Sequence, residues 1–176
     1  MRKYLLSALL LTLSAQAAAA VEESTPSGFS VRNRATVAAT PAETWAMLGR
    51  IGEWWNDEHT YSGKAANMRL ELKAGGCFCE ALPARSAGPS GSIEHGRVLT
   101  AMPYDMLVLD APLGPLQSQA MVGRFSWTLR AAAGGTEITQ TFVAGGYARG
   151  GADKLAPIVD KVLAEQLEGL KRRLAR

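Results

Sequence analysis

The sequence predicts an α+β domain. We expect a curved antiparallel sheet of about six to seven strands that wraps on a long C-terminal helix. Two observations lead to this expectation. Short segments of strand composition, most of them separated by Gly, Pro or Asp, fill residues 68–143. One wide apolar stripe at helical spacing then runs from about Asp153 to Arg173. An antiparallel sheet with helices gathered on one face is an α+β arrangement.

Residues 1–20 have the three parts of a secretory signal. Arg2 and Lys3 precede an apolar run from Tyr4 to Leu13, and small residues follow it. The run has about ten residues, whereas a membrane-spanning helix needs about 20. We therefore expect cleavage near Ala20, export to the periplasm and no stable membrane insertion afterwards. An uncleaved anchor is the alternative.

The next elements follow from local signals. Residues 21–28 hold Ser, Thr, Pro and Gly without periodicity, which indicates a flexible leader. Residues 29–37 alternate like a half-buried strand. Thr40, Pro41 and Glu43 form a capping box with Pro at the first helical position, so a short helix begins there. Short helices after the first strand are therefore expected.

The rest of the domain, which spans residues 29–174, is a run of strands and one helix. Strand composition occurs in residues 68–72, 77–82, 92–101 and 106–110, and in a hairpin of 123–131 and 136–143. Pro157 must lie in the first turn of the closing helix, where its missing N–H costs little. A long helix on a curved sheet tends to leave an apolar cavity, which is a default ligand site.

Charge excludes one class of partner. The chain has 19 basic and 16 acidic residues, and both charged residues of the signal are basic, so 17 basic and 16 acidic residues follow it. That balance leaves no electrostatic footprint for nucleic acid.

Several landmarks occur in an order that resembles a known superfamily. They are residues 39–45, the Trp54-Trp55 pair, residues 75–78, residues 123–129 and the final helix. Together they resemble the helix-grip (SRPBCC) superfamily, which includes START-type lipid-binding domains, polyketide cyclase-like proteins and domains similar to the activator of the Hsp90 ATPase. The resemblance covers residues 29–174. It implies the fold, but the superfamily contains carriers, cyclases, hydrolases and co-chaperone modules.

Within that superfamily the chain is most similar to an exported bacterial group of poorly defined function. Residues 59–63, 113–117 and 145–147 carry this likeness. No catalytic residue set comes with it. Hsp90 is not an expected partner, because export separates this chain from a cytosolic ATPase.

An aromatic loop is the main candidate for ligand contacts. Trp54, Trp55, His59 and Tyr61 lie in one loop before the sheet, and Tyr147 precedes the final helix. In a helix-grip arrangement both segments lie near the cavity mouth. Trp and Tyr combine apolar area with a polar tip, which suits an amphipathic ligand. One of the two tryptophans is expected to be plain core.

Two further polar residues are candidates for contacts inside the same cavity. Gln117 lies in the Gly-Pro-Leu-Gln turn, and His95 lies on the strand expected to pair with residues 77–82. Either His59 or His95 is able to serve as a general acid or base. The chain has no Gly-x-Ser-x-Gly elbow.

Cys77 and Cys79 form the chain's only cysteine pair. Residues i and i+2 of a strand lie about 6.6 to 6.8 Å apart at Cα, near the upper limit for a disulfide. A disulfide therefore needs a bulge, which Gly75-Gly76 is able to start. Small buried thiols bordering the cavity are favoured. A disulfide, or a reactive or metal-binding pair with His95, are the alternatives. We expect no metal and no other cofactor.

These observations favour an exported protein that holds a small apolar, amphipathic or lipid-like molecule between sheet and helix. The alternatives are a cyclase- or hydrolase-type enzyme with a histidine acid/base, and a thiol or metal protein centred on Cys77 and Cys79. The sequence leaves open the ligand, the oligomeric state and the pathway.

Overall fold

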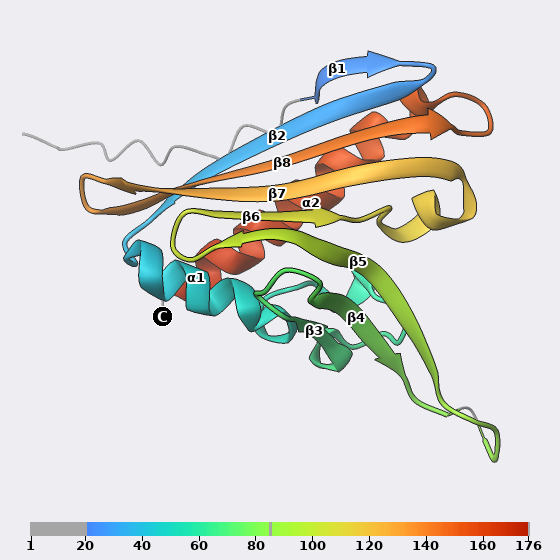
Figure 1. The fold of residues 1–176 in the computed structure, drawn as a ribbon, viewed down its shortest axis with the longest axis horizontal. Helices are drawn as coiled ribbons and strands as arrows, with labels where there is room; N and C mark the ends of the chain where they lie inside the picture. The colour runs from blue at the N-terminus through green and yellow to red at the C-terminus, as the bar shows by residue number, and fades with distance from the viewer. Residues whose placement is uncertain (1–20, 85, 176) are drawn as a thin grey trace, which may run out of the picture.

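The structure, a computed structural model, describes residues 21–84 and 86–175, so the predicted signal lies outside the described residues. In this part of the chain eight strands form one antiparallel sheet, in the order β1-β2-β8-β7-β6-β5-β4-β3 (Figure 1). The strands are β1 (Val21–Thr25), β2 (Gly28–Val37), β3 (Met68–Leu70), β4 (Cys77–Leu82), β5 (Gly91–Met102), β6 (Met106–Asp110), β7 (Ala120–Ala132) and β8 (Gly135–Tyr147). The α+β class and the helix-grip architecture are confirmed, with slightly more strands than predicted.

The additional strand is β1, where the sequence suggested a flexible leader. β1 pairs with β2, and Thr25 lies opposite Gly28 across the turn. Every side chain of β1 is exposed. Because neither face of β1 is buried, its sequence carries no apolar alternation, and the prediction of a leader was wrong for this reason.

The helix α1 (Pro41–Gly49) begins where the capping box predicted. The backbone N–H of Glu43 donates to Thr40 Oγ1 at 3.3 Å, and the backbone N–H of Thr40 donates to Glu43 Oε2 at 2.8 Å. Three short 3-10 turns follow within the described chain, at Ile51–Glu53, Asp57–His59 and Ala65–Asn67. They carry the chain from α1 through the aromatic loop to β3.

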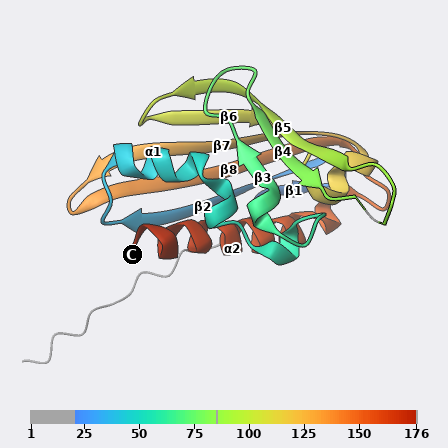
Figure 2. The same cartoon turned by 90° about the horizontal axis from the view of Figure 1, so that it is seen from below.

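The helix α2 (Ala156–Leu174) lies across one face of the sheet and packs most closely on β2 (Figures 1 and 2). Pro157 is in its first turn, as predicted, and Lys171, Arg172 and Arg173 fall in its last turn, where cations complement the helix dipole. Its apolar side, with Leu163, Leu167 and Leu170, is buried in the core. In the described chain, no helix has both the length and the apolar character to cross a membrane.

A close approach fixes α2 against the loop after α1. A Cβ atom at Gly169 would lie 2.4 Å from the backbone oxygen of Trp54, so only glycine fits at this position. The backbone of the aromatic loop therefore rests directly on α2.

The pairing of β4 with β5 contains a β-bulge. Phe78 lies opposite Gly96, but the next residue, Cys79, lies opposite Glu94. β5 therefore has one residue more than β4 at this point, which is His95. Because of the extra residue, Glu94 and Arg97 both lie on the outer face of β5, where their side chains pair, while His95 turns inward.

Candidate functional site

A groove of about 570 Å³ runs along one side of α2. Most of its lining comes from α2, and Val21 of β1 and Asn56 of the aromatic loop complete it. The residues from α2 are Pro157, Asp160, Lys161, Ala164, Glu165, Glu168 and Arg172. The groove therefore has charged side chains along the helix and one buried carboxyl group, that of Asp160.

Behind Asp160 lies a row of polar side chains in the interior, which we call the polar row: Asn33, Trp127, Gln140 and Asp160. Asn33 on β2, Gln140 on β8 and Trp127 on β7 are direct cross-strand partners. Their side chains share the buried face of the sheet, and Asp160 faces them from α2. All four residues are at most 8% exposed.

Each member of the polar row has an unpaired polar atom. Asn33 Nδ2 donates to Gln140 Oε1 at 3.4 Å. Among residues 21–84 and 86–175, however, buried atoms without a hydrogen-bond partner include Asn33 Oδ1, Trp127 Nε1, Gln140 Nε2 and Asp160 Oδ1. An unpaired buried polar atom costs about 1 to 3 kcal/mol, so such atoms usually pair with an ordered water, an ion or a ligand.

The charge state of Asp160 is set by its surroundings. Burial raises the pKa of the Asp160 carboxyl above its ordinary value, and the side chain of Asn33 opposes that shift only in part. The interior therefore disfavours the carboxylate form. A ligand group that donates a hydrogen bond or carries positive charge would restore it.

The aromatic loop is tied to α2 beside the groove. The backbone N–H of Asn56 donates to Gln166 Oε1 at 2.8 Å, and His59 Nε2 lies 2.9 Å from Glu165 Oε2. His59 thus reaches the groove through Glu165, which lines it. The indole N–H groups of Trp54 and Trp55 donate to the backbone oxygens of Met47 and His59.

Both tryptophans are buried in the core, where the sequence analysis expected this of one. Their rings are 5.7 Å apart, and Trp55 packs edge-on against Phe78 at 5.5 Å. They hold the loop in place and do not line the groove.

A second polar cluster lies on the inner face of β4 and β5. Glu80 Oε2 is 2.9 Å from His95 Nε2, and both side chains are buried. Glu80 also accepts hydrogen bonds from the backbone N–H of Tyr61 at 3.1 Å and of Ser62 at 2.5 Å. The His95 ring stacks near Phe78 and Tyr61. Glu80 therefore clamps the end of the aromatic loop to the sheet.

The pKa values of Glu80 and His95 are both lowered from their ordinary values. Burial raises the pKa of Glu80, but the hydrogen bonds from Ser62, Tyr61 and His95 outweigh burial, and the net pKa is lowered. Burial lowers the pKa of His95 more than Glu80 raises it. At neutral pH the cluster is therefore an ionised carboxylate beside a neutral imidazole.

The cysteines are joined in a disulfide, with their Cα atoms 5.4 Å apart. The favoured expectation of two small thiols is thereby corrected. The β4–β5 pairing bulges beside Cys79, and the Cα separation is shorter than in a regular strand. The pair also lies on the outer face of β4, whereas Phe78 and Glu80 point inward. The expected border with the interior cavity, and a metal site shared with His95, are therefore wrong.

The remaining predicted residues are at the surface. Gln117 Nε2 donates to the backbone oxygen of Glu94 at 2.7 Å, and Tyr61 Oη donates to that of Gly114 at 3.2 Å. Tyr147 is 69% exposed. Neither these residues nor the other predicted ligand contacts line the groove itself, and their binding of a ligand stays a prediction.

Sequence reasoning missed the polar row. Asn33 and Gln140 interrupt strand segments at positions where the alternation calls for an apolar side chain, and Asp160 interrupts the apolar stripe of the final helix. Those interruptions were the available signal.

No protein-family model matches the chain, and no curated protein matches its sequence. Solved structures with a similar fold do exist. The Mll3558 protein of Rhizobium loti is 15% identical, with a TM-score of 0.59 over 82% of this chain and 96% of its own. CalU16 of Micromonospora echinospora is 16% identical, with a TM-score of 0.55 over 84% and 74%.

The Aha1 dimer of Colwellia psychrerythraea is 14% identical, with a TM-score of 0.52 over 82% of this chain and 95% of its own. Identities this low establish the fold and leave activity open. Together with the antiparallel sheet and the C-terminal helix, these likenesses show that the chain has the helix-grip fold that the sequence landmarks resembled.

Proposed function

We propose that the protein is an exported binder of a small amphipathic molecule, which lies in the groove along α2 and places a polar group against Asp160. The single observation that carries the proposal is the polar row. Its buried, unpaired atoms begin at a residue that lines the groove and continue across the sheet. A ligand that reaches Asp160 has hydrogen-bonding partners behind it.

The size and lining of the groove support a small molecule. A volume of about 570 Å³ lies within the range of ligand pockets, about 300 to 1,000 Å³. Val21, Pro157 and Ala164 offer apolar surface. Burial of apolar ligand surface contributes about 25 cal/mol per Å², and each newly paired atom of the polar row contributes about 1 kcal/mol more.

Export is the second part of the proposal, and the sequence of residues 1–20 supports it. Intact-mass measurement of protein recovered from the periplasm tests it. We expect a chain that begins at Val21. Recovery of the uncleaved chain in the cytoplasm would contradict export without bearing on ligand binding.

Ligand binding is tested by native mass spectrometry of protein purified from its producing bacterium. We expect an adduct of defined mass on the wild-type protein and its loss in Asp160→Asn. Glu137→Gln is the matched control, because Glu137 is an exposed carboxylate on β8 and lies outside the groove. If wild type and Asp160→Asn carry the same adduct, or if neither carries one nor takes one up from a lipid extract, the proposal is wrong.

A hydrolytic or cyclase-type enzyme is the second candidate, favoured by the buried pair of His95 and Glu80. A neutral imidazole held by an ionised carboxylate has the charge state of a general base. Turnover of a panel of 4-nitrophenyl esters tests this candidate. Loss of turnover in His95→Gln with unchanged thermal stability supports it, and equal turnover in both proteins excludes His95 as the base.

A further inference from the structure

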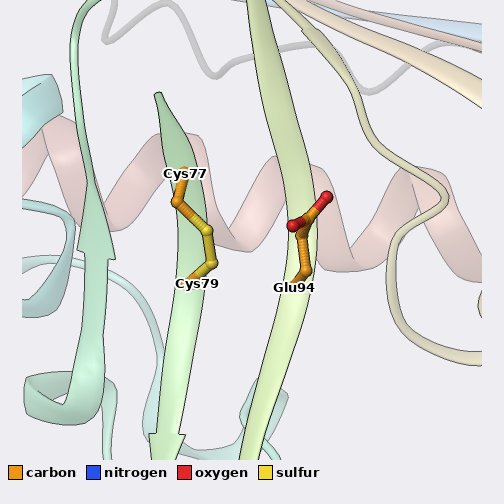
Figure 3. Close-up of side chains that lie close together, drawn as sticks. All are labelled: Cys77, Cys79 and Glu94. Carbon is orange, nitrogen blue, oxygen red and sulfur yellow. A yellow bond between two sulfur atoms is a disulfide. The ribbon is translucent and has the colours of Figure 1, made fainter. Parts of the chain in front are cut away.

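The disulfide of Cys77 and Cys79 lies on the outer face of the sheet, away from the groove and the polar row. Glu94 of the neighbouring strand lies beside it (Figure 3). One carboxylate oxygen of Glu94 and the two sulfur atoms all lie within 4.8 Å of one another. Cys79 and Glu94 are partly or fully exposed, so the cluster is open to solvent.

This disulfide contributes little to the stability of the fold. Its two cysteines are separated by one residue of the same strand, so it connects no distant parts of the fold. The stabilisation from closing a loop grows with the length of the loop, and this loop is close to the shortest one. A structural role therefore does not account for the pair.

The bulge in β5 brings the third group to the disulfide. Because β5 has the extra residue His95, Glu94 lies opposite Cys79 and Arg97 lies opposite Cys77 on the same outer face. The guanidinium group of Arg97 donates to Glu94 and to the backbone oxygen of Gly75, which fixes the carboxylate. An ionised carboxylate has about four lone-pair sites, so an oxygen that accepts from Arg97 retains capacity for a cation.

The three groups together offer a set of metal ligands. Two cysteine sulfur atoms and one carboxylate oxygen lie close enough to bind the same cation once the disulfide is reduced. Two thiolates, one carboxylate and one water form a ligand set that suits Zn²⁺.

We propose that Cys77, Cys79 and Glu94 form a redox-gated site for a thiophilic divalent cation such as Zn²⁺. The oxidised form, in which the disulfide is intact, does not bind the cation. A dithiol reductant converts it to the reduced form: the reductant's two thiols become a disulfide, the Cys77–Cys79 bond breaks, and each cysteine gains one electron and one proton. The cation then displaces both thiol protons and binds the two sulfur atoms, and Glu94 supplies the third ligand.

The test is a zinc titration of the full purified protein against a competing chromophoric chelator, in oxidised and phosphine-reduced forms. We expect the reduced protein to bind one equivalent of Zn²⁺ and the oxidised protein to bind none at the same concentration. Cys79→Ser removes the site. Glu94→Gln should weaken zinc binding by at least about tenfold. Even the loss of a residue that only orients a metal ligand costs about 10- to 100-fold in metal affinity, and Glu94 is itself a ligand.

A control variant isolates the site. Asp105→Asn removes another carboxylate that is paired with an arginine, Arg130, in the turn between β5 and β6, and leaves zinc affinity unchanged. Circular dichroism of each variant shows that the fold is retained. Equal zinc affinity in reduced wild type and Cys79→Ser, or in wild type and Glu94→Gln, would overturn the proposal, whereas the ligand adduct in the α2 groove is unaffected by either result.

Discussion

Glu80 and His95 are joined through a carboxylate oxygen and Nε2, 2.9 Å apart, on the inner face of β4 and β5. The β-bulge that turns His95 inward also turns Glu94 outward toward the disulfide. One irregularity in β5 thus builds a buried pair on one face and an exposed cluster on the other. The stability of the aromatic loop depends on the first of these.

Glu80→Gln should destabilise the protein by about 3 kcal/mol, because an ionised acceptor of several hydrogen bonds is worth more than a neutral one. The new amide N–H₂ would also face a backbone donor of Tyr61 or Ser62. Urea unfolding measures the change. Glu137→Gln, at an exposed carboxylate on β8, is the control and should stay within about 0.5 kcal/mol. Equal effects of the two substitutions would mean that the clamp does not hold the loop.

The same pair should make the protein sensitive to acid. The pKa of His95 is lowered in the fold, so below the ordinary value of 6.5 the unfolded chain binds more protons and stability falls as pH falls. The lowered pKa of Glu80 adds a further loss below its ordinary value of 4.5. In His95→Gln the loss between pH 6.5 and 4.5 should shrink, while the loss below 4.5 remains. The free energy of unfolding, measured from above pH 6.5 to below pH 4.5, tests these two losses. An unchanged profile in His95→Gln would contradict the role of His95.

Gly96 should not tolerate a side chain. A Cβ atom there would lie 2.6 Å from Ala111 Cβ and 2.7 Å from the backbone oxygen of Asp110, so the neighbouring strand must move. Gly96→Ala should cost about 2 kcal/mol by overpacking. Gly91→Ala on the same strand meets only the Leu82 side chain, at 3.4 Å or more, and serves as the control. Thermal unfolding compares them, and equal midpoints would rule out a tight bulge.

Asp160→Asn should stabilise the free protein while it weakens ligand binding. The raised pKa of Asp160 means that the folded chain holds its proton more tightly than the unfolded chain, so stability decreases as pH rises above the ordinary value of 3.8. A neutral amide of the same shape removes this cost, so Asp160→Asn should be more stable than wild type at neutral pH. Unfolding in urea at neutral pH measures the gain. A loss of stability would indicate that Asp160 supports the fold rather than a ligand.

The fold was predictable because its signals are local. The capping box at Thr40 placed α1, and the apolar stripe with Pro157 placed α2. β1 was missed because its side chains are all exposed, which removes the alternation that marks a strand. The sequence does not predict the disulfide, because regular strand spacing places the Cα atoms of Cys77 and Cys79 too far apart. The β-bulge beside Cys79 depends on the pairing of β4 with β5, which the sequence of β4 alone does not reveal.

The candidate site was less predictable, because it depends on tertiary pairing. Trp54 and Trp55 are of a residue type common at ligand contacts, yet both are buried in the core. Asn33 and Gln140 are distant in sequence and become neighbours only through the register of β2 and β8. They indicate a candidate site only in the folded structure, where Asp160 faces them from α2.

The most direct test of the central claim is an NMR titration that follows the side-chain N–H signals of Trp127 and Gln140. The compound recovered from the native protein, or a library of small amphipathic fragments, is added to the isotopically labelled protein. We expect these signals to shift together with the backbone signal of Asp160, and Asp160→Asn to abolish the shifts. Binding that moves other signals and leaves those of the polar row unchanged would contradict the account.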